Sequence, residues 1–190
     1  MKWIGNRISY SEDSLKSTFI VYPEKKAMVT AMMGAWCAMW LTIGFVMIWA
    51  FATLEMTDQE KIITVVFLAF WVYYARRVVK SLFWLLFGKE MLKINETSFT
   101  IKKSIKGFGK AQDYFLENIE KIKLSHPNDN SIQAIWENSP WVMGGERLEF
   151  EHKGKVVRFG RKIPEKEAKL FFNIITKRIE DKIRKNRKTT

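Results

Sequence analysis

Apolar and polar residues divide the chain into two contrasting parts. Residues 27–54 contain no Asp, Glu, Lys, Arg or His, and as a helix they would exceed the roughly 30 Å hydrocarbon core of a bilayer. A second run, residues 62–75, is shorter, so it must borrow length from residues 57–61 and from the snorkelling arginines that follow it. We predict transmembrane helices over residues 27–54 and 58–80, with an amphipathic extension to residue 87.

After residue 87 the chain changes to short apolar segments separated by turn residues. Alternation and turn chemistry predict seven strands, over residues 90–95, 98–104, 110–116, 119–125, 131–136, 146–152 and 155–159. Pro164 suits a first helical turn, and the helix after it has an apolar stripe of Ala168, Phe171, Phe172, Ile175 and Ile179. The sequence therefore predicts an α+β membrane protein, in which a transmembrane helical hairpin at residues 27–87 precedes a domain at residues 88–190. That domain is expected to be a seven-stranded β barrel or sandwich capped by a C-terminal helix.

The net charge of +12 is concentrated in the second part of the chain. Residues 1–87 carry nine Lys and Arg against six Asp and Glu, whereas residues 88–190 carry twenty-three against fourteen. Basic proteins bind nucleic acid or anionic lipid, and a chain already tethered to a bilayer meets lipid first. We therefore expect anionic lipids, and no nucleic acid, among its partners.

Cations flank the outer ends of the predicted hairpin, whereas its connecting turn holds only Lys61. The flanking cations are Lys16, Lys25 and Lys26 before the hairpin and Arg76, Arg77, Lys80 and Lys89 after it. By the positive-inside rule both termini are predicted to face the cytoplasm, in a multi-pass protein of the cell inner membrane. Residues 1–26 would then form a cytoplasmic N-terminal segment, lying on the membrane surface or loosely docked as an arm.

Small residues recur every four positions along the first run and predict a helix-packing ridge, formed by Thr30, Gly34, Ala38 and Thr42. The ridge either packs on the second span or docks a larger membrane complex. Met33 and Cys37 are also four apart, and soft sulfur ligands raise the alternative of a Cu(I) site. Methionine commonly fills irregular apolar surface, so we expect no metal here. Cys37 is the only cysteine, which excludes an intramolecular disulfide.

A second candidate site is cationic. Lysines cluster around the turn after the second predicted strand, at Lys102, Lys103, Lys106 and Lys110. Together with Arg76, Arg77 and Lys80 they are candidates for binding anionic lipid headgroups. The alternative is a solvated basic edge that discourages strand-to-strand aggregation.

Catalytic motifs are missing from the sequence. It has no Walker loop, nucleophile elbow, HExxH or zinc-ligand spacing, and Gly107-Phe108-Gly109 is a turn and not a dinucleotide fingerprint. His126 and His152 are expected to be surface residues. Trp141, before Gly144-Gly145, is either an exposed interface anchor on a mobile loop or a tucked-in side chain. We expect no enzyme and no cofactor.

Three segments carry a resemblance to a known family. GKEMLKINETSFTIKKSIKGFGKAQDYFLENIEKIKLS, the later RLEFEHKGKVVRFG and the helix beginning IPEKEAKLFF resemble bacterial proteins in which a two-span hairpin precedes a pleckstrin-homology-like domain. The similarity covers roughly residues 27–183 and rests on turns and apolar positions, so it implies a fold and not an activity. In layout alone, the chain is similar to the two-span photosystem assembly factor of chloroplasts and cyanobacteria.

These observations favour a non-catalytic integral membrane scaffold, accessory or assembly protein. It would dock a larger membrane complex, or a second copy of itself as a homo-oligomer, through its hairpin and its pleckstrin-homology-like domain. An anionic-lipid-binding surface module is the alternative, and a metal- or cofactor-associated subunit is a weaker one.

Overall fold

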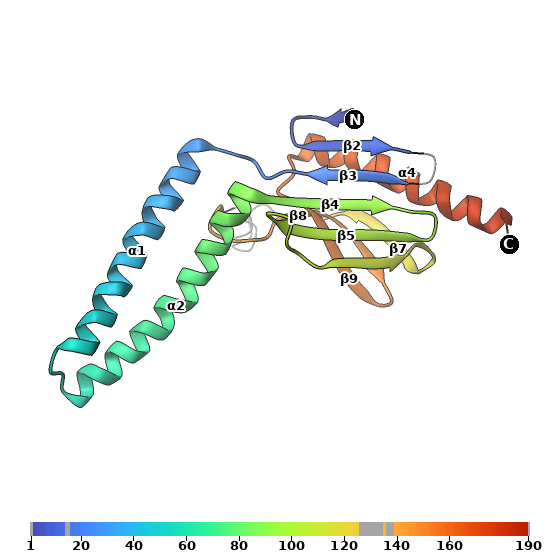
Figure 1. Cartoon of the computed structure of the whole chain (residues 1–190). Coiled ribbons are helices and arrows are strands. Elements are labelled where there is room, and N and C mark those ends of the chain that lie inside the picture. Colours follow the sequence, from blue (N-terminus) through green and yellow to red (C-terminus); the bar gives the residue numbers. More distant parts are fainter. Residues whose placement is uncertain (1, 14–15, 126–134, 136–138, 190) are drawn as a thin grey trace. The chain divides into compact units, whose positions relative to one another are not determined.

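The computed structural model describes residues 2–13, 16–125, 135 and 139–189, with side chains as far as residue 186 (Figure 1). The chain folds into two compact units. The globular unit comprises Met1–Glu24, Phe87–Asn138 and Gly144–Thr190, and the helical unit comprises Lys25–Leu86 and Ser139–Met143. Each unit is described separately below.

The helical unit contains two long antiparallel helices, α1 (Ala27–Thr53) and α2 (Asp58–Phe87) (Figure 1). Both are long and apolar enough to cross a membrane, judged by length and composition. Thr57 and Glu60 cap α2 reciprocally: the hydroxyl oxygen of Thr57 accepts the backbone N–H of Glu60 at 3.4 Å, and Glu60 Oε2 accepts the backbone N–H of Thr57 at 2.8 Å. The prediction of two long apolar helices is confirmed, and the predicted extension to residue 87 is a continuous part of α2.

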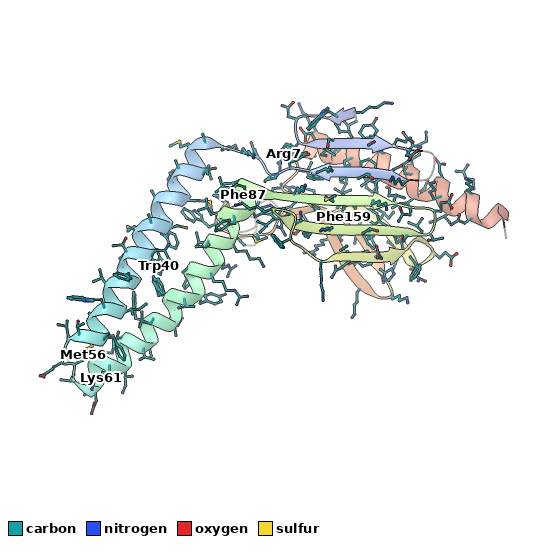
Figure 2. The ribbon with its side chains drawn as sticks, in the orientation of Figure 1. Arg7, Trp40, Met56, Lys61, Phe87 and Phe159 are labelled. Carbon is teal, nitrogen blue, oxygen red and sulfur yellow. The ribbon has the colours of Figure 1, made fainter. Side chains whose placement is uncertain are left out.

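Two tryptophans join the helices near the middle of α1. Trp40 donates its indole N–H to the carbonyl oxygen of Trp71 at 3.2 Å, and Trp71 donates its own to the carbonyl oxygen of Trp40 at 2.7 Å. Trp40 lies on the side of α1 that faces α2 (Figure 2). A carbonyl oxygen has a second lone pair beyond its helical bond, so both indoles are satisfied without breaking either helix. Because an unpartnered N–H is costly in apolar surroundings, this reciprocal pair fixes how the helices face each other.

The packing interface between α1 and α2, which we call the seam, is narrow around the tryptophan pair. On α1 the buried residues are Met33, Cys37 and Gly44, and on α2 they include Thr64, Ala75 and Val78. A side chain at position 44 has no room, because a Cβ built on Gly44 would overlap the indole of Trp71. Gly44 therefore sets the close approach of the two helices.

The globular unit contains a six-stranded and a three-stranded antiparallel sheet (Figure 1). The larger has the order β1-β2-β3-β4-β5-β6, formed by β1 (Lys2–Ile4), β2 (Ile8–Glu12), β3 (Ser17–Val21), β4 (Gly88–Ile94), β5 (Ser98–Ile105) and β6 (Ala111–Phe115). The smaller has the order β7-β8-β9, formed by β7 (Ile119–Leu124), β8 (Glu146–His152) and β9 (Lys155–Arg161). A short 3-10 helix, η1 (Leu116–Asn118), links the sheets, and α4 (Glu165–Thr189) ends the chain.

Both sheets and α4 contribute to one apolar core. The ring of Phe99 on β5 lies 5.4 Å from that of Phe159 on β9, and Phe19 on β3 meets Phe171 on α4 edge-on at 5.6 Å. The apolar stripe predicted for the last helix supplies the buried residues of α4, namely Ala168, Phe171, Ile175 and Ile179, with Phe172 partly buried beside them. The predicted C-terminal helix is therefore confirmed as a core element.

The N-terminal segment belongs to this fold, so the prediction of a loosely docked arm at residues 1–26 is wrong. β3 pairs with β4 from Ser17 opposite Ile94 to Val21 opposite Glu90, and Phe19 is buried. The first three strands are only three to five residues long, and serines and charged residues interrupt them. Their apolar residues are therefore recognisable as strand positions only once β4 is known to pair with β3, and β4 lies beyond both helices in the sequence.

A seven-stranded barrel or sandwich was predicted for residues 88–190, but the described residues form two separate sheets that do not close into a barrel. β4, β5 and β6 extend the N-terminal strands into one sheet, and β7, β8 and β9 form another. Because β3 occupies the free edge of β4, the larger sheet grows in that direction instead of closing. Six of the predicted strands match β4 to β9 within two residues at each end. The seventh, at residues 131–136, lies outside the described residues apart from Ile135.

Gly44→Leu should destabilise the hairpin by about 2 kcal/mol, because the new side chain overpacks the seam against Trp71. Gly34→Leu is the matched control on the same helix, since a Cβ at Gly34 meets no atom within 4 Å. Thermal unfolding of the full chain in mild detergent, followed by circular dichroism, measures both. Equal losses for the two variants would contradict this assignment of the seam.

Phe19→Ala should cost about 3–5 kcal/mol of unfolding free energy, because it opens a cavity beside Phe171. Thr18→Ala, on the other face of β3, should cost much less. Denaturant unfolding of the full chain in detergent, read by near-ultraviolet circular dichroism, compares them. If Phe19→Ala is no more damaging than Thr18→Ala, the N-terminal strands are not part of the core.

Candidate functional site

The small-residue ridge does not form the seam between the two helices. Ala38 and Thr42 are exposed, and Thr30 and Gly34 are half-buried. A step of four residues turns a helix by about 40° beyond a full turn, so a ridge with this spacing winds away from a fixed neighbour. The hydroxyls of Thr30 and Thr42 donate to carbonyl oxygens of their own helix, at 3.1 and 2.9 Å. Hence the ridge is open, and its polar groups are already satisfied.

Met33 and Cys37 lie in the seam, where both are buried and cluster with Val78. Their surroundings are therefore apolar side chains. Within the part of the chain that the structure describes, no group of three or more His, Cys, Asp and Glu side chains is arranged to hold a metal ion. The observed role of this sulfur pair is helix packing.

Trp141 is tucked in, which decides between the two predictions made for it. It belongs to the helical unit, where its ring meets that of Trp36 edge-on at 5.5 Å. Ser81 of α2 donates its hydroxyl to the carbonyl oxygen of Trp141 at 3.1 Å. The contacts that hold the segment Ser139–Met143 against the hairpin therefore include this aromatic pair and this hydrogen bond.

The predicted lipid-binding residues separate into two groups. Most of them are exposed or half-exposed, namely Arg76, Arg77, Lys80, Lys102, Lys106 and Lys110. Lys103 differs, because its ammonium lies 2.9 Å from Glu146 and 3.9 Å from Glu90. Its ammonium is therefore paired inside the fold with Glu146, and Lys103 is removed from the candidate lipid-binding set.

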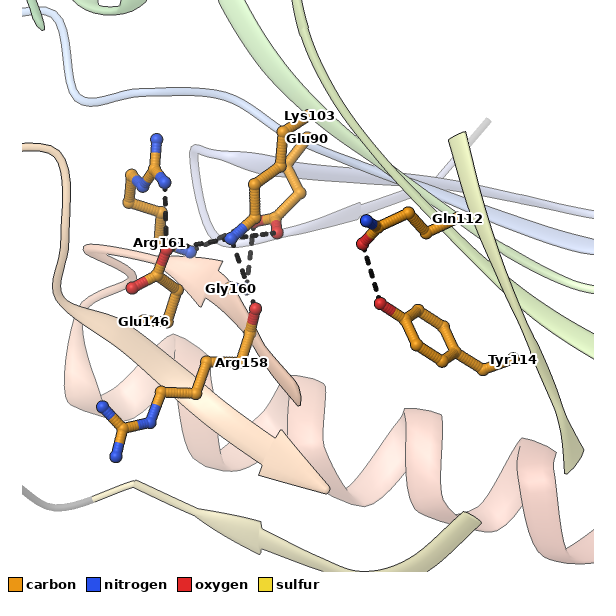
Figure 3. Close-up of polar contacts among 8 residues, drawn as sticks. All are labelled: Glu90, Lys103, Gln112, Tyr114, Glu146, Arg158, Gly160 and Arg161. Carbon is orange, nitrogen blue, oxygen red and sulfur yellow. Dashed lines mark hydrogen bonds and ion pairs between the residues drawn. The ribbon is translucent and has the colours of Figure 1, made fainter. Parts of the chain in front are cut away.

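Lys103 is part of a buried charge cluster with Glu90, Glu146 and Arg161 (Figure 3). Glu90 Oε2 accepts the backbone N–H groups of Gly160 and Arg161, at 2.9 and 3.2 Å. Glu146 Oε1 accepts hydrogen bonds from Lys103 and from the Arg161 guanidinium, each at 2.9 Å. The cluster thus joins β4 and β5 of the larger sheet to β8 and β9 of the smaller one.

Burial and neighbouring charge shift the pKa values in and beside this cluster. Burial raises the pKa of Glu90, against the pull of Lys103 and of its backbone donors. Burial also opposes ionisation of Glu146, but the charges of Lys103 and Arg161 outweigh it and lower the pKa from 4.5 to about 2. Burial and the charge of Arg161 lower the pKa of Lys162 to about 8. Glu146 is therefore ionised at neutral pH, and its negative charge lies between the two cations.

The geometry of the cluster suits cohesion between the sheets. Its carboxylates and cations face one another inside the fold, and removing one partner would leave a buried charge uncompensated. Alternation along the strands was a usable signal for it, because Glu90 shares a face with Leu92, and Lys103 shares one with Phe99. No local pattern indicated the partners on β8 and β9, which are brought to the cluster by tertiary packing.

A scan against protein-family models and searches of curated proteins and of solved structures find no match for this chain. The resemblance to two-span proteins with a pleckstrin-homology-like domain therefore stays a prediction, and function must be argued from the geometry.

Glu146→Gln should destabilise the globular unit by about 2 kcal/mol at neutral pH, because it removes the charge between Lys103 and Arg161. Since the folded-state pKa of about 2 lies below the ordinary 4.5, this stabilisation is complete above pH 4.5 and is lost as the pH falls toward 2. Denaturant unfolding of the wild type and the variant at a series of pH values should give stabilities that converge at the acid end.

Glu151→Gln is the control for this experiment, because its partner Lys121 is 72% exposed and the pair is screened by solvent. It should change stability little at any pH. A Glu146→Gln loss that persists unchanged at pH 2 would contradict the electrostatic origin of the effect.

Proposed function

We propose that this chain is a non-catalytic, membrane-anchored scaffold or assembly protein that docks a larger membrane complex. The observation that carries the proposal is the position of the small-residue ridge. α1 and α2 use another face for their own seam, which leaves Ala38 and Thr42 exposed. In lipid, where apolar side chains gain little from meeting each other, a ridge of this kind favours close approach of a further helix.

The proposed anchoring is a two-span crossing of the cell inner membrane with both termini in the cytoplasm. The lengths and apolar character of α1 and α2 support the crossing. Pairing of β3 with β4 supports placing both ends of the hairpin on one side, because those strands immediately flank the helices. The excess of cations next to these ends, compared with one in the turn, supports a cytoplasmic side.

For the globular unit we propose a pleckstrin-homology-like core that carries an extension. β4 to β9 followed by α4 agree with the resemblance found in the sequence, and β1, β2 and β3 would be an addition to the edge of β4. This unit would present the cytoplasmic docking surface of the scaffold.

A photo-crosslinking amino acid in place of Phe45 tests the docking. Phe45 is 72% exposed and lies three residues beyond Thr42, next to the ridge. In native membranes it should give one discrete protein adduct, and Gly34→Leu should abolish that adduct without unfolding the hairpin. The mass of the adduct distinguishes a larger complex from a second copy of this chain.

The matched control replaces Phe70, an exposed residue of α2, with the same crosslinker. It should yield lipid adducts only. Identical protein adducts at both positions, or an adduct at position 45 that survives Gly34→Leu, would contradict docking through the ridge.

A further inference from the structure

The six-stranded sheet connects to α1 and α2 at one end of its strands, where β3 ends and β4 begins. Strand register places the end of β3 beside the start of β4, with Val21 opposite Glu90, and the start of β4 beside the end of β5, with Gly88 opposite Ile105. The β1–β2 turn and the β5–β6 turn lie at this same end. We call this row of strand ends and turns the helix-side edge. The assignment depends only on strand pairing within the globular unit.

The β5–β6 turn at this edge presents an aromatic side chain to solvent. The backbones of Ile105 and Phe108 exchange hydrogen bonds of 2.9 and 3.0 Å, so Lys106 and Gly107 form a tight two-residue turn. Their φ values of 50° and 91° are those of a type I′ turn. Phe108, at 84% exposure, is the most exposed of the large apolar side chains that the structure describes. The fold thus holds a phenylalanine outward on a rigid hairpin, between Lys106 and Lys110.

This turn is fixed to the residue at which α2 ends. The backbone N–H of Lys106 donates to the carbonyl oxygen of Phe87 at 3.3 Å, and the Lys106 ammonium lies 4.4 Å from the centre of the Phe87 ring. Phe87 is the last residue of α2 and is itself 42% exposed. Within the globular unit, Phe87, Lys106 and Phe108 therefore form one apolar and cationic surface at the tip of the turn.

Besides Phe87 and Phe108, two further aromatic residues of the globular unit lie at the same edge. Trp3 is exposed and stacks on Tyr22, with ring centroids 6.1 Å apart. Arg7, labelled in Figure 2, lies in the β1–β2 turn and donates from Nε to the carbonyl oxygen of Tyr22 at 2.9 Å, which fixes the backbone of Tyr22 to this turn. Tryptophan and tyrosine gather where a membrane meets water, because their rings are apolar and their polar atoms need partners.

We infer that the helix-side edge rests on an anionic bilayer surface, with Phe108 inserted at the boundary between headgroups and acyl chains and with Lys106 and Lys110 at the level of the lipid phosphates. Charge favours an anionic surface as the occupant, because Lys89, Lys106 and Lys110 of the globular unit all lie at this edge. The contact of Lys106 with the exposed ring of Phe87 supports the same occupant, because it places a cation beside apolar surface. The inference rests on the proposed membrane crossing but is independent of docking through the ridge.

The test places an environment-sensitive fluorophore at single cysteines in the full chain, with Cys37→Ala as background. Phe108→Cys is the probe. Phe115→Cys is its control, because Phe115 is also exposed but lies at the opposite end of β6, about 23 Å further along an extended strand. Phe70→Cys on α2 reports the membrane crossing itself. The protein is reconstituted into vesicles with about 30% phosphatidylglycerol in phosphatidylcholine, and nitroxide-labelled lipids quench probes that enter the bilayer.

We expect quenching at position 108 to be at least about threefold stronger than at position 115, together with strong quenching at position 70. Quenching at 70 but not at 108 would overturn this inference and leave the membrane crossing intact. A probe at 108 that is shielded from water but not quenched by lipid would mean a protein contact, which also overturns it. Absence of quenching at 70 would overturn the crossing on which both proposals depend.

The contribution of charge is tested by adding Lys106→Glu and Lys110→Glu to the Phe108→Cys protein. Quenching at position 108 should then fall by about half or more, and it should fall similarly for the unmodified turn in vesicles of phosphatidylcholine alone. Unchanged quenching in both cases would overturn the anionic preference. The Phe70→Cys signal, measured in parallel, checks that the charge-reversed chain still inserts.

Discussion

Pairing of β3 with β4 is the constraint on which the rest of this structure depends. These two strands lie next to each other in the sheet, although the whole helical hairpin separates them in the sequence. Their pairing brings the two ends of the hairpin to one place and joins the N-terminal strands to the later domain. It also gathers the turns and aromatic residues of the helix-side edge at the point where the chain leaves the sheet. An independent arm at the N-terminus could do none of this.

The two units are held together internally by different kinds of interaction. In the helical unit, hydrogen bonds from Trp40 and Trp71 reach across a seam that Gly44 keeps narrow. In the globular unit, Glu90 and Glu146 gather cations and backbone donors from both sheets. Polar contacts of both kinds add direction to apolar packing, because a partly buried donor or charge that loses its partner is costly.

Features that depend on neighbouring residues could be predicted from the sequence, whereas features that depend on partners far along the chain could not. Length and lack of charge were sufficient for α1 and α2, and alternation located β4 to β9 within about two residues. The strands before the hairpin were missed, since Phe19 and Val21 are ordered by a partner far along the chain. Lys103 was wrongly included among the candidate lipid-binding residues for a similar reason, because its carboxylate partner on β8 is distant in sequence. The ridge was found as a motif, but only the structure showed which way it faces.

The interruption of one sheet by a membrane-type hairpin has a consequence for biosynthesis. When β3 leaves the ribosome, its bonding partner has not yet been made, and both helices must be synthesised before β4 can reach it. During that interval Phe19 and Val21 have no core to enter, and the outer edge of β3 is unpaired. Completion of the sheet is thus delayed until after the helices have emerged, which couples maturation of the globular unit to correct placement of the hairpin.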